Sequence, residues 1–374
     1  MKRFVYADNA ATTKLDNEAF EAMRAFLQGD FGNPSAIYSF SKVPRQAIRK
    51  ARETIAACIG ALPSEIYFTS GGTESDNWAL KGTAFSSPEH AEIITSSFEH
   101  HAVLYSCTAL NRLGYPISYI KPSTDGVVCV EDLRNAITDR TVLVSIMYAN
   151  NELGTVQPIQ ELCSIAHDKG VLFHTDAVQA VGHVPIDVKA LGIDMLSASA
   201  HKFNGPKGVG FLYIRDGVKI LPFLNGGAQE DKMRAGTENV AAIVGMAVAL
   251  QKNCHCMQQN ITHVRSLEKM LLCELKHAGI KFQRNGSGNM LPGVINLSFD
   301  TGEGEAILHR LDLMGVCVST GSACDSQRTQ ISHVLRAIDL DTEKALRTIR
   351  ISLGKDNSEE DIQQIVRALT KILS

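Results

Sequence analysis

Short apolar runs alternate with segments of helical periodicity along the first two thirds of the chain. The helical segment from Pro158 to Lys169 places apolar side chains on one face, and Gly170 ends it before the next run. Nearly continuous apolar strands separated by helices are typical of a mostly parallel sheet covered on both faces. The pattern therefore predicts an α/β core with strands at residues 66–70, 93–96, 142–148, 171–175, 195–199 and 209–214.

The last third of the chain has a different pattern. A long helical stretch from Asn239 to His277 is followed by a shorter βαβ-like region and a final helix. That helix starts at Ser358, with Asp361 in the capping-box position. Since 374 residues are many for one core, we expect two domains, divided near residue 258. The predicted large domain is 15–257, and the small domain combines 1–14 with 258–374.

Composition excludes several classes of protein. Apolar residues make up 44% and charged residues 21%, as in soluble globular proteins. The net charge is -3, from 37 basic and 40 acidic residues that are well mixed, so no nucleic-acid surface is expected. There is no export signal and no run of roughly 18 apolar residues that would span a membrane. Nine cysteines without a framework spacing fit a reducing compartment, so we expect a cytoplasmic protein.

A lysine and an aspartate follow two of the predicted strands. Lys202 follows the strand at 195–199, and Asp176 ends the strand at 171–175. Ligands of open α/β sheets bind outside such strand ends. A desolvated lysine can form a Schiff base with an aldehyde cofactor, and an ionised aspartate can keep a pyridine nitrogen protonated. A surface lysine and an aspartate that caps a helix are the alternatives, and the capping role is compatible with the cofactor role.

A third segment is typical of an anion site. Residues 68–77 read as a strand, two glycines and a polar helix start. The amides of Gly72 and Thr73, together with the Thr73 hydroxyl, could hold one phosphate. Neither G-x-x-x-x-G-K-[ST] nor G-x-G-x-x-G occurs, which disfavours a nucleoside triphosphate or a dinucleotide. A plain strand-to-helix turn is the alternative.

These segments together resemble the cysteine desulfurases, fold-type I pyridoxal-phosphate enzymes of the class V aminotransferase group, over essentially the whole chain. The resemblance implies a large domain with a mostly parallel seven-stranded sheet, a smaller C-terminal α/β domain and a homodimer. The stretches that carry it occur in order at residues 6–13, 32–35, 69–77, 99–100, 150–154, 174–179, 200–208, 234–238, 321–324 and 350–354.

The resemblance also implies roles for individual residues. Lys202 would hold pyridoxal 5'-phosphate covalently and act as a base, Asp176 would pair with the ring nitrogen, and His100 would stack on the ring. Gln179 would contact the ring hydroxyl side. The phosphate would be held by Gly72, Thr73, Ser199 and His201, with Thr237 reaching in from a second subunit. The substrate carboxylate would be met by Arg350 and Asn151, assisted by Asn33, since a guanidinium suits bidentate recognition.

Cys324 differs from the other cysteines. Its neighbours in residues 318–328 are small and polar, which predicts a flexible loop rather than a core position. Cys129 and Cys317 lie beside valines and are predicted to pack in the interior, and Cys254-His255-Cys256 is not a zinc spacing. The resemblance implies that the Cys324 thiolate takes sulfur from L-cysteine as a persulfide and that alanine is released.

Other functions remain open at this point. An aminotransferase or a selenocysteine lyase would use the same cofactor, and a non-catalytic sulfur carrier or assembly scaffold could share the fold. No metal site is predicted, because neither H-E-x-x-H nor C-x-x-C occurs. The sulfur would pass to an acceptor protein, such as an iron-sulfur scaffold or a thiolation protein. The sequence does not identify that acceptor.

Overall fold

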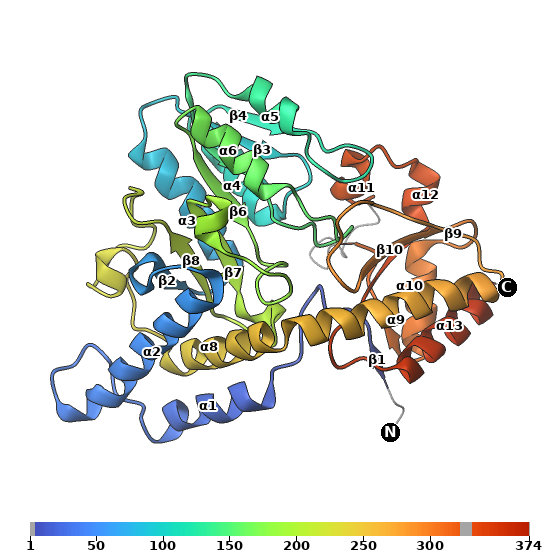
Figure 1. Cartoon of the computed structure of the whole chain (residues 1–374), viewed down its shortest axis with the longest axis horizontal. Coiled ribbons are helices and arrows are strands. Elements are labelled where there is room, and N and C mark those ends of the chain that lie inside the picture. Colours follow the sequence, from blue (N-terminus) through green and yellow to red (C-terminus); the bar gives the residue numbers. More distant parts are fainter. Residues whose placement is uncertain (1–3, 322–330, 374) are drawn as a thin grey trace.

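The computed structural model describes residues 4–321 and 331–373 and has a seven-stranded central sheet (Figure 1). Only β8 runs antiparallel to its neighbours β2 and β7; the other pairs are parallel, so the predicted α/β fold class is confirmed. The predicted runs all form strands, and the edge strand β4 joins them. In spatial order the strands are β2 (Ile66–Thr69), β8 (Gly210–Ile214), β7 (Met195–Ser199), β6 (Leu172–Asp176), β5 (Thr141–Ser145), β3 (Glu92–Ser96) and β4 (Ile117–Ile120).

Helices cover both faces of this sheet, because its strands are apolar on both sides. Leu143 of β5 and Leu212 of β8 pack in a cluster with α3 (Gly72–Ser86) and α4 (His101–Arg112). Their neighbours Val144 and Phe211 point to the opposite face, as strand alternation requires, and join the main core. The helices that contribute to that core include α2 (Lys42–Ile59), α5 (Val130–Ala136), α6 (Ile159–Asp168), α7 (Val188–Leu191) and α8 (Val240–His255), with α1 (Asn17–Gln28) against α8.

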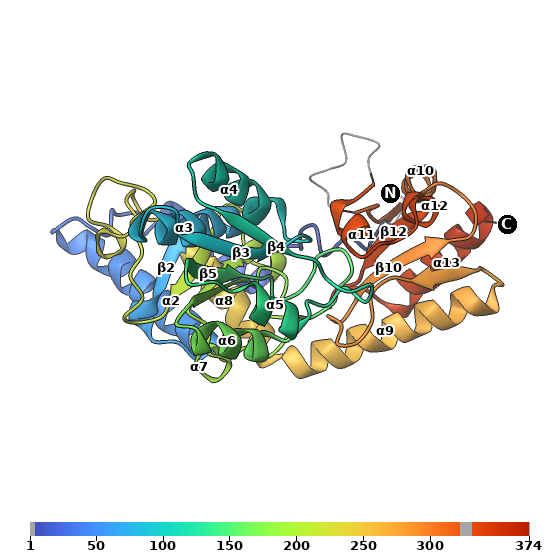
Figure 2. The ribbon, with the colours of Figure 1, turned by 90° about the horizontal axis from the view of Figure 1, so that it is seen from above.

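A second, smaller lobe lies at the other end of the molecule (Figures 1 and 2). Its hydrophobic cluster combines Val5 and Ala7 with residues between 264 and 369, so both ends of the chain meet there. We retain the domain division predicted above as a proposal. The lobe contains the sheet β12 (Thr348–Ser352), β10 (Val294–Phe299) and β9 (Phe282–Arg284), the pair β1 (Val5–Tyr6) and β11 (Val316–Cys317), and the helices α9 (Met257–His277), α10 (Gly304–Leu313), α11 (His333–Ala337), α12 (Thr342–Leu346) and α13 (Glu359–Leu373).

The long helical stretch expected from Asn239 to His277 is two helices. The chain leaves helical geometry at Cys256, and α8 and α9 are bent by 71° relative to one another. The bend lets α8 pack on α1 and α2 while α9 packs on α13. The capping box of the last helix is confirmed, since the Ser358 amide donates to Asp361 Oδ2 at 3.1 Å and the Asp361 amide donates to Ser358 Oγ at 3.4 Å.

In the described part of the chain, no single helix is long and apolar enough to cross a membrane. Helices α8 and α9 meet that criterion only when they are taken together across their bend, on length and composition alone.

Candidate active site

A cavity of about 230 Å³ opens at the carboxyl ends of the central parallel strands. Ligands of open α/β sheets bind at this edge. Segments that are far apart in the sequence meet there, including the N-terminal stretch at Ala10 and Ala11 and the small-lobe strand β12. The predicted site residues that line it are Gly72, Thr73, His100, Asn151, Asp176, Gln179, Ser199, His201, Lys202 and Arg350.

Lys202 ends a short 3-10 turn (Ala200–Lys202) that follows β7. Its Nζ donates hydrogen bonds to the carbonyl oxygens of Ala10 at 2.6 Å and Ala11 at 2.9 Å. His183 Nε2 lies 2.9 Å from the Lys202 carbonyl oxygen, which fixes the backbone on the other side. The lysine is therefore held against the N-terminal stretch. Sequence reasoning noticed that stretch but gave Ala10 and Ala11 no role.

Asp176 is the last residue of β6 and is buried. Its Oδ1 accepts a hydrogen bond of 2.9 Å from the Val178 amide, so it also caps the following turn, as the alternative interpretation expected. Burial raises the pKa of Asp176, while the charges of His100 and Lys202 lower it. Both His100 and Lys202 line the cavity with it.

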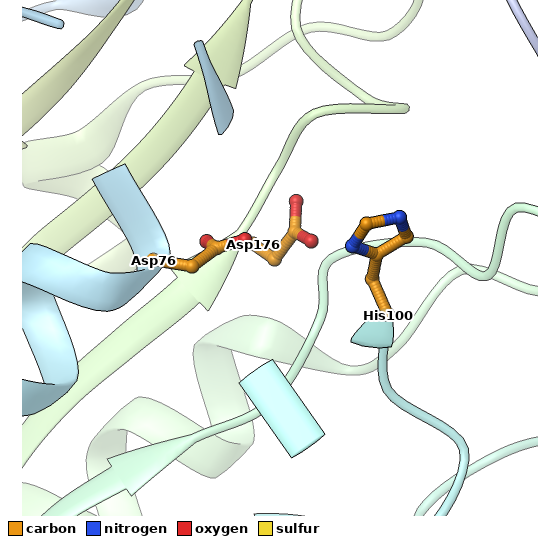
Figure 3. Close-up of side chains that lie close together, drawn as sticks. All are labelled: Asp76, His100 and Asp176. Carbon is orange, nitrogen blue, oxygen red and sulfur yellow. The ribbon is translucent and has the colours of Figure 1, made fainter. Parts of the chain in front are cut away.

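A second buried aspartate lies behind Asp176, and sequence reasoning missed it. Asp76 comes from the first turns of α3 and is 1% exposed. Figure 3 shows its carboxyl group beside Asp176, with His100 across from them. Ligand atoms of these three side chains lie within 4.8 Å of one another, an arrangement that a metal ion could occupy. Since all three line the cavity with Lys202, we treat them as part of the same site.

His100 lies at the cavity and is the N-cap residue of α4. Its Nδ1 accepts a hydrogen bond of 3.1 Å from the Ala102 amide, so that nitrogen carries no proton. Burial lowers the pKa of His100, which favours the neutral ring. Beside it, the fully buried Glu99 accepts from the Met147 amide at 2.9 Å, and burial raises the pKa of Glu99 to about 8.

The strand, two glycines and helix start predicted at 68–77 form as the end of β2, a turn and the first residues of α3. The first amides of α3, at Gly72 and Thr73, lie at the cavity, where a helix start favours an anion. Gly72 has no room for a side chain, since a Cβ there would lie 2.5 Å from Val178 Cγ2. Ser199 and His201 line the same cavity, and burial, with the Lys202 charge, lowers the pKa of His201 to about 4.

Arg350 reaches the cavity from β12 and is 1% exposed. Its Nη2 lies 2.7 Å from Asp8 Oδ1, and its Nη1 donates to the Asn151 carbonyl oxygen at 3.0 Å. The third nitrogen, Nε, has no hydrogen-bond partner among the described residues. A guanidinium fixed on one side in this way presents a donor set for a carboxylate.

Three predicted site residues are not among those that line this cavity. Asn33 and Thr237 are exposed, and the Asn33 side chain accepts a hydrogen bond from the Ser35 amide. Cys324 falls within 322–330, outside the described residues.

The prediction that Cys129 packs in the interior is wrong. Its side chain is exposed, because Cys129 lies just before α5, where the chain turns at the surface, and the neighbouring Val128 takes the buried position. Cys317 is partly buried. The eight cysteines that the structure describes are all free thiols.

Comparisons with known proteins place the chain in one family. The model of the family "Aminotransferase class-V" matches residues 5–365. A Dictyoglomus turgidum protein named cysteine desulfurase IscS is 51% identical over 100% of this chain and 95% of its own length. The cysteine desulfurase NifS of Azotobacter vinelandii is 43% identical over 99% of this chain and 92% of its own length.

Solved structures give the same result. A structure described as a NifS-like protein superposes with a TM-score of 0.93 and 38% identity, covering 99% of both chains. Another, described as SspA in complex with cysteine, has a TM-score of 0.85 and 37% identity, covering 94% of this chain and 99% of that one.

The chain therefore belongs to the class-V aminotransferase family. Enzymes of this family depend on pyridoxal 5'-phosphate, which confirms the resemblance and the cofactor expected from the sequence. The residues fit this cofactor. A lysine, a buried carboxylate and a helix start with a glycine that excludes a side chain all line one cavity.

Proposed function

We propose that this enzyme is a pyridoxal-phosphate-dependent cysteine desulfurase. It converts L-cysteine to L-alanine and transfers the sulfur to Cys324 as a persulfide. The observation that carries the proposal is that Lys202, Asp176 and Arg350 line one cavity in a chain whose relatives bear the name cysteine desulfurase.

The cavity residues divide into groups that would hold different parts of the cofactor. Gly72, Thr73, Ser199 and His201 would hold the phosphate, aided by the helix start of α3. Asp176 would face the ring nitrogen and Gln179 the ring hydroxyl side, while His100 would lie on the ring face. Lys202 would hold the aldehyde carbon. When bound, the cofactor supplies an electron sink for the substrate carbon.

Substrate recognition would fall to Arg350 and Asn151, with Asn33 assisting. The Arg350 guanidinium is already oriented by Asp8 and by the Asn151 carbonyl oxygen, so it can meet the substrate carboxylate with little loss of side-chain entropy. Because Asn33 is exposed and does not line this cavity, its assistance requires a different arrangement of its loop or a second subunit.

The chemical roles follow from the side chains. Lys202 Nζ would act as the base that removes the Cα proton of cysteine. The Cys324 thiolate then attacks the substrate sulfur. An S–S bond forms as the Cβ–S bond breaks, and the bonding electron pair goes to the substrate carbon. Protonation of that carbon leads to alanine, and Cys324 carries the sulfur.

We also propose a homodimer in which Thr237 enters the cavity of the partner. Exposed apolar side chains gather at residues 31–43, where Phe31, Ile37, Tyr38, Phe40 and Val43 are all open to solvent. Such a concentration is typical of a protein interface.

Two ion pairs fix residues that lie shortly before Thr237 in the chain. Arg52 pairs with the buried Glu230 at 2.6 Å, and Arg234 pairs with Glu74 of α3 at 2.8 Å. Thr237 itself is exposed, as a residue that contacts a second subunit must be in a single chain.

The sulfur acceptor and the compartment complete the proposal. The relatives named IscS and NifS support delivery to an iron-sulfur scaffold or a thiolation protein. The eight free thiols of the described residues support the cytoplasm, where cysteines stay reduced.

The deciding experiment incubates the purified holoenzyme with L-cysteine and a reductant and measures alanine and sulfide together. We expect equal amounts of both, lost in Cys324→Ala, which keeps the absorbance of the lysine-bound cofactor. Alanine formation from cysteine that survives in Cys324→Ala would contradict the persulfide route. Activity only with selenocysteine or with an amino acceptor would instead identify a selenocysteine lyase or an aminotransferase.

A further inference from the structure

Three carboxyl groups are buried close together at the cavity. Asp76, Glu99 and Asp176 are at most 5% exposed, and the first lies beside Asp176 (Figure 3). Like charges in a desolvated space destabilise one another strongly. The three groups therefore cannot all be ionised, and at least one must keep its proton.

Asp176 is best placed to carry the negative charge. Its Oδ1 accepts from the Val178 amide, and it shares the cavity with Lys202, whose positive charge favours an ionised carboxylate. For Glu99, burial raises the pKa by more than its hydrogen bonds with Ser96 and Met147 lower it, which favours the protonated form.

Asp76 has weaker support for a negative charge, which comes from a hydrogen bond with the Ser197 side chain. Its Oδ1 has no hydrogen-bond partner among the described residues, and none of these contributes a lysine or arginine ion pair to it. His174 Nε2 lies 3.7 Å from that oxygen, but the His174 ring is fully buried. Its two nitrogens lie within 3.0 Å of the hydroxyl oxygens of Ser145 and Ser197, an arrangement that suits a neutral ring.

We propose that Asp76 is a positioning residue that keeps its proton and donates a hydrogen bond to Asp176, so that Asp176 stays ionised and faces the cofactor ring. Burial and the nearby charges of Asp176 and Glu99 raise the pKa of Asp76 by more than a hydrogen bond with Ser197 lowers it, and this direction agrees with the role. The inference rests on the proposed function only in taking Asp176 as the partner of the ring nitrogen.

The test compares Asp76→Asn with Asp76→Ala in the holoenzyme. Asparagine keeps an N–H donor and cannot ionise, whereas alanine removes the donor. We expect the absorbance titration of the lysine-bound cofactor to stay close to wild type in Asp76→Asn and to shift its midpoint in Asp76→Ala. Turnover in Asp76→Ala should fall on the order of 10²-fold, with a smaller change in KM, because Asp176 is then misplaced.

Infrared spectroscopy gives a reading that does not depend on turnover. The carboxylic-acid C=O band of Asp76 should be present in wild type and absent from Asp76→Asn. Lys81→Ala, in the same helix but not at the cavity, is the control for disturbance of α3 and should leave the titration unchanged.

Two results would overturn the inference. One is an Asp76→Asn enzyme that is as impaired as Asp76→Ala. The other is an Asp76→Asn infrared spectrum that keeps every carboxylic-acid C=O band of the wild type. Failure of the wild-type holoenzyme to form alanine from cysteine would instead reject the proposed function, while the titration would still decide the role of Asp76.

Discussion

Arg350 of the small lobe pairs with Asp8 of the N-terminal stretch, with 2.7 Å between Nη2 and Oδ1. The two residues are 342 positions apart, and the guanidinium is buried. Through this pair, and through the hydrogen bonds from Lys202 to Ala10 and Ala11, the N-terminal stretch joins β12 of the small lobe to the lysine turn of the large sheet. Displacement of this stretch would disturb both the lysine and the arginine.

Replacing Arg350 by lysine should weaken substrate binding more than it lowers the catalytic rate. A lysine offers a point charge and cannot reproduce the planar fork that holds Asp8 and the Asn151 carbonyl oxygen while meeting a carboxylate. We expect the KM for cysteine to rise by about tenfold, roughly 1.4 kcal/mol of binding free energy. Steady-state kinetics of alanine formation measures this, and Arg347→Lys, at a more exposed arginine, is the control. An unchanged KM would argue against a role in carboxylate binding.

Replacing Lys202 by alanine should abolish the absorbance of the lysine-bound cofactor and the turnover of cysteine. The reason is that no other described lysine lines the cavity. The measurement is the visible spectrum of purified Lys202→Ala. The control is Lys219→Ala, which changes an exposed lysine after β8 and should keep the absorbance. A Lys202→Ala protein that is yellow without added amine would refute this assignment.

Replacing Asp176 by asparagine should keep the turn and lose the charge. The amide oxygen can still accept from the Val178 amide, so the fold should persist. Turnover should fall on the order of 10²- to 10³-fold, because a neutral partner no longer holds the ring nitrogen protonated. Single-turnover alanine formation in the cofactor-loaded variant is the measurement. Unchanged turnover would contradict the electron-sink argument.

The buried His174 should make the folded protein sensitive to acid. Burial lowers its pKa from 6.5 to about 3. Between these values the unfolded chain binds a proton that the folded chain excludes. The free energy of unfolding is therefore not reduced by His174 above pH 6.5, and it decreases as the pH falls toward 3. At pH 5 this group alone costs about 2 kcal/mol of unfolding free energy.

The variant His174→Gln isolates this effect. It should show a smaller loss of unfolding free energy between pH 7 and pH 5 than wild type, as measured by urea unfolding. Loss of its contacts with Ser145 and Ser197 lowers stability at every pH, so only the slope is compared. His277→Gln, at an exposed position, should keep the wild-type slope. Equal slopes in wild type and His174→Gln would disprove the assignment.

Much of the fold and several parts of the site could be predicted from local patterns. Strands that are buried on both faces are apolar along their whole length, which is why the run at 195–199 could be recognised without a structure. Lys202 and Asp176 follow such runs directly, and Gly72 opens a helix, so their common edge of the sheet followed from parallel topology.

Other features depend on neighbours that are distant in sequence. The bend at Cys256 has no glycine or proline to mark it, and it arises because α8 and α9 pack on different partners. The exposure of Cys129 is similar, since valines on both sides describe its sequence but not the turn before α5.

By itself, the sequence determined the alternation of strands and helices and the glycines at the start of α3. It also determined the identity of the lysine, aspartate and cysteine proposed for the chemistry. These features reside in short stretches whose hydrophobic period and turn residues are local. Only the tertiary structure decided that Asp76 lies buried beside Asp176, that Ala10 and Ala11 hold Lys202, and that Asp8 orients Arg350. These relationships arise when separate segments pack together and exclude water, and no local pattern encodes which distant residue will share the space.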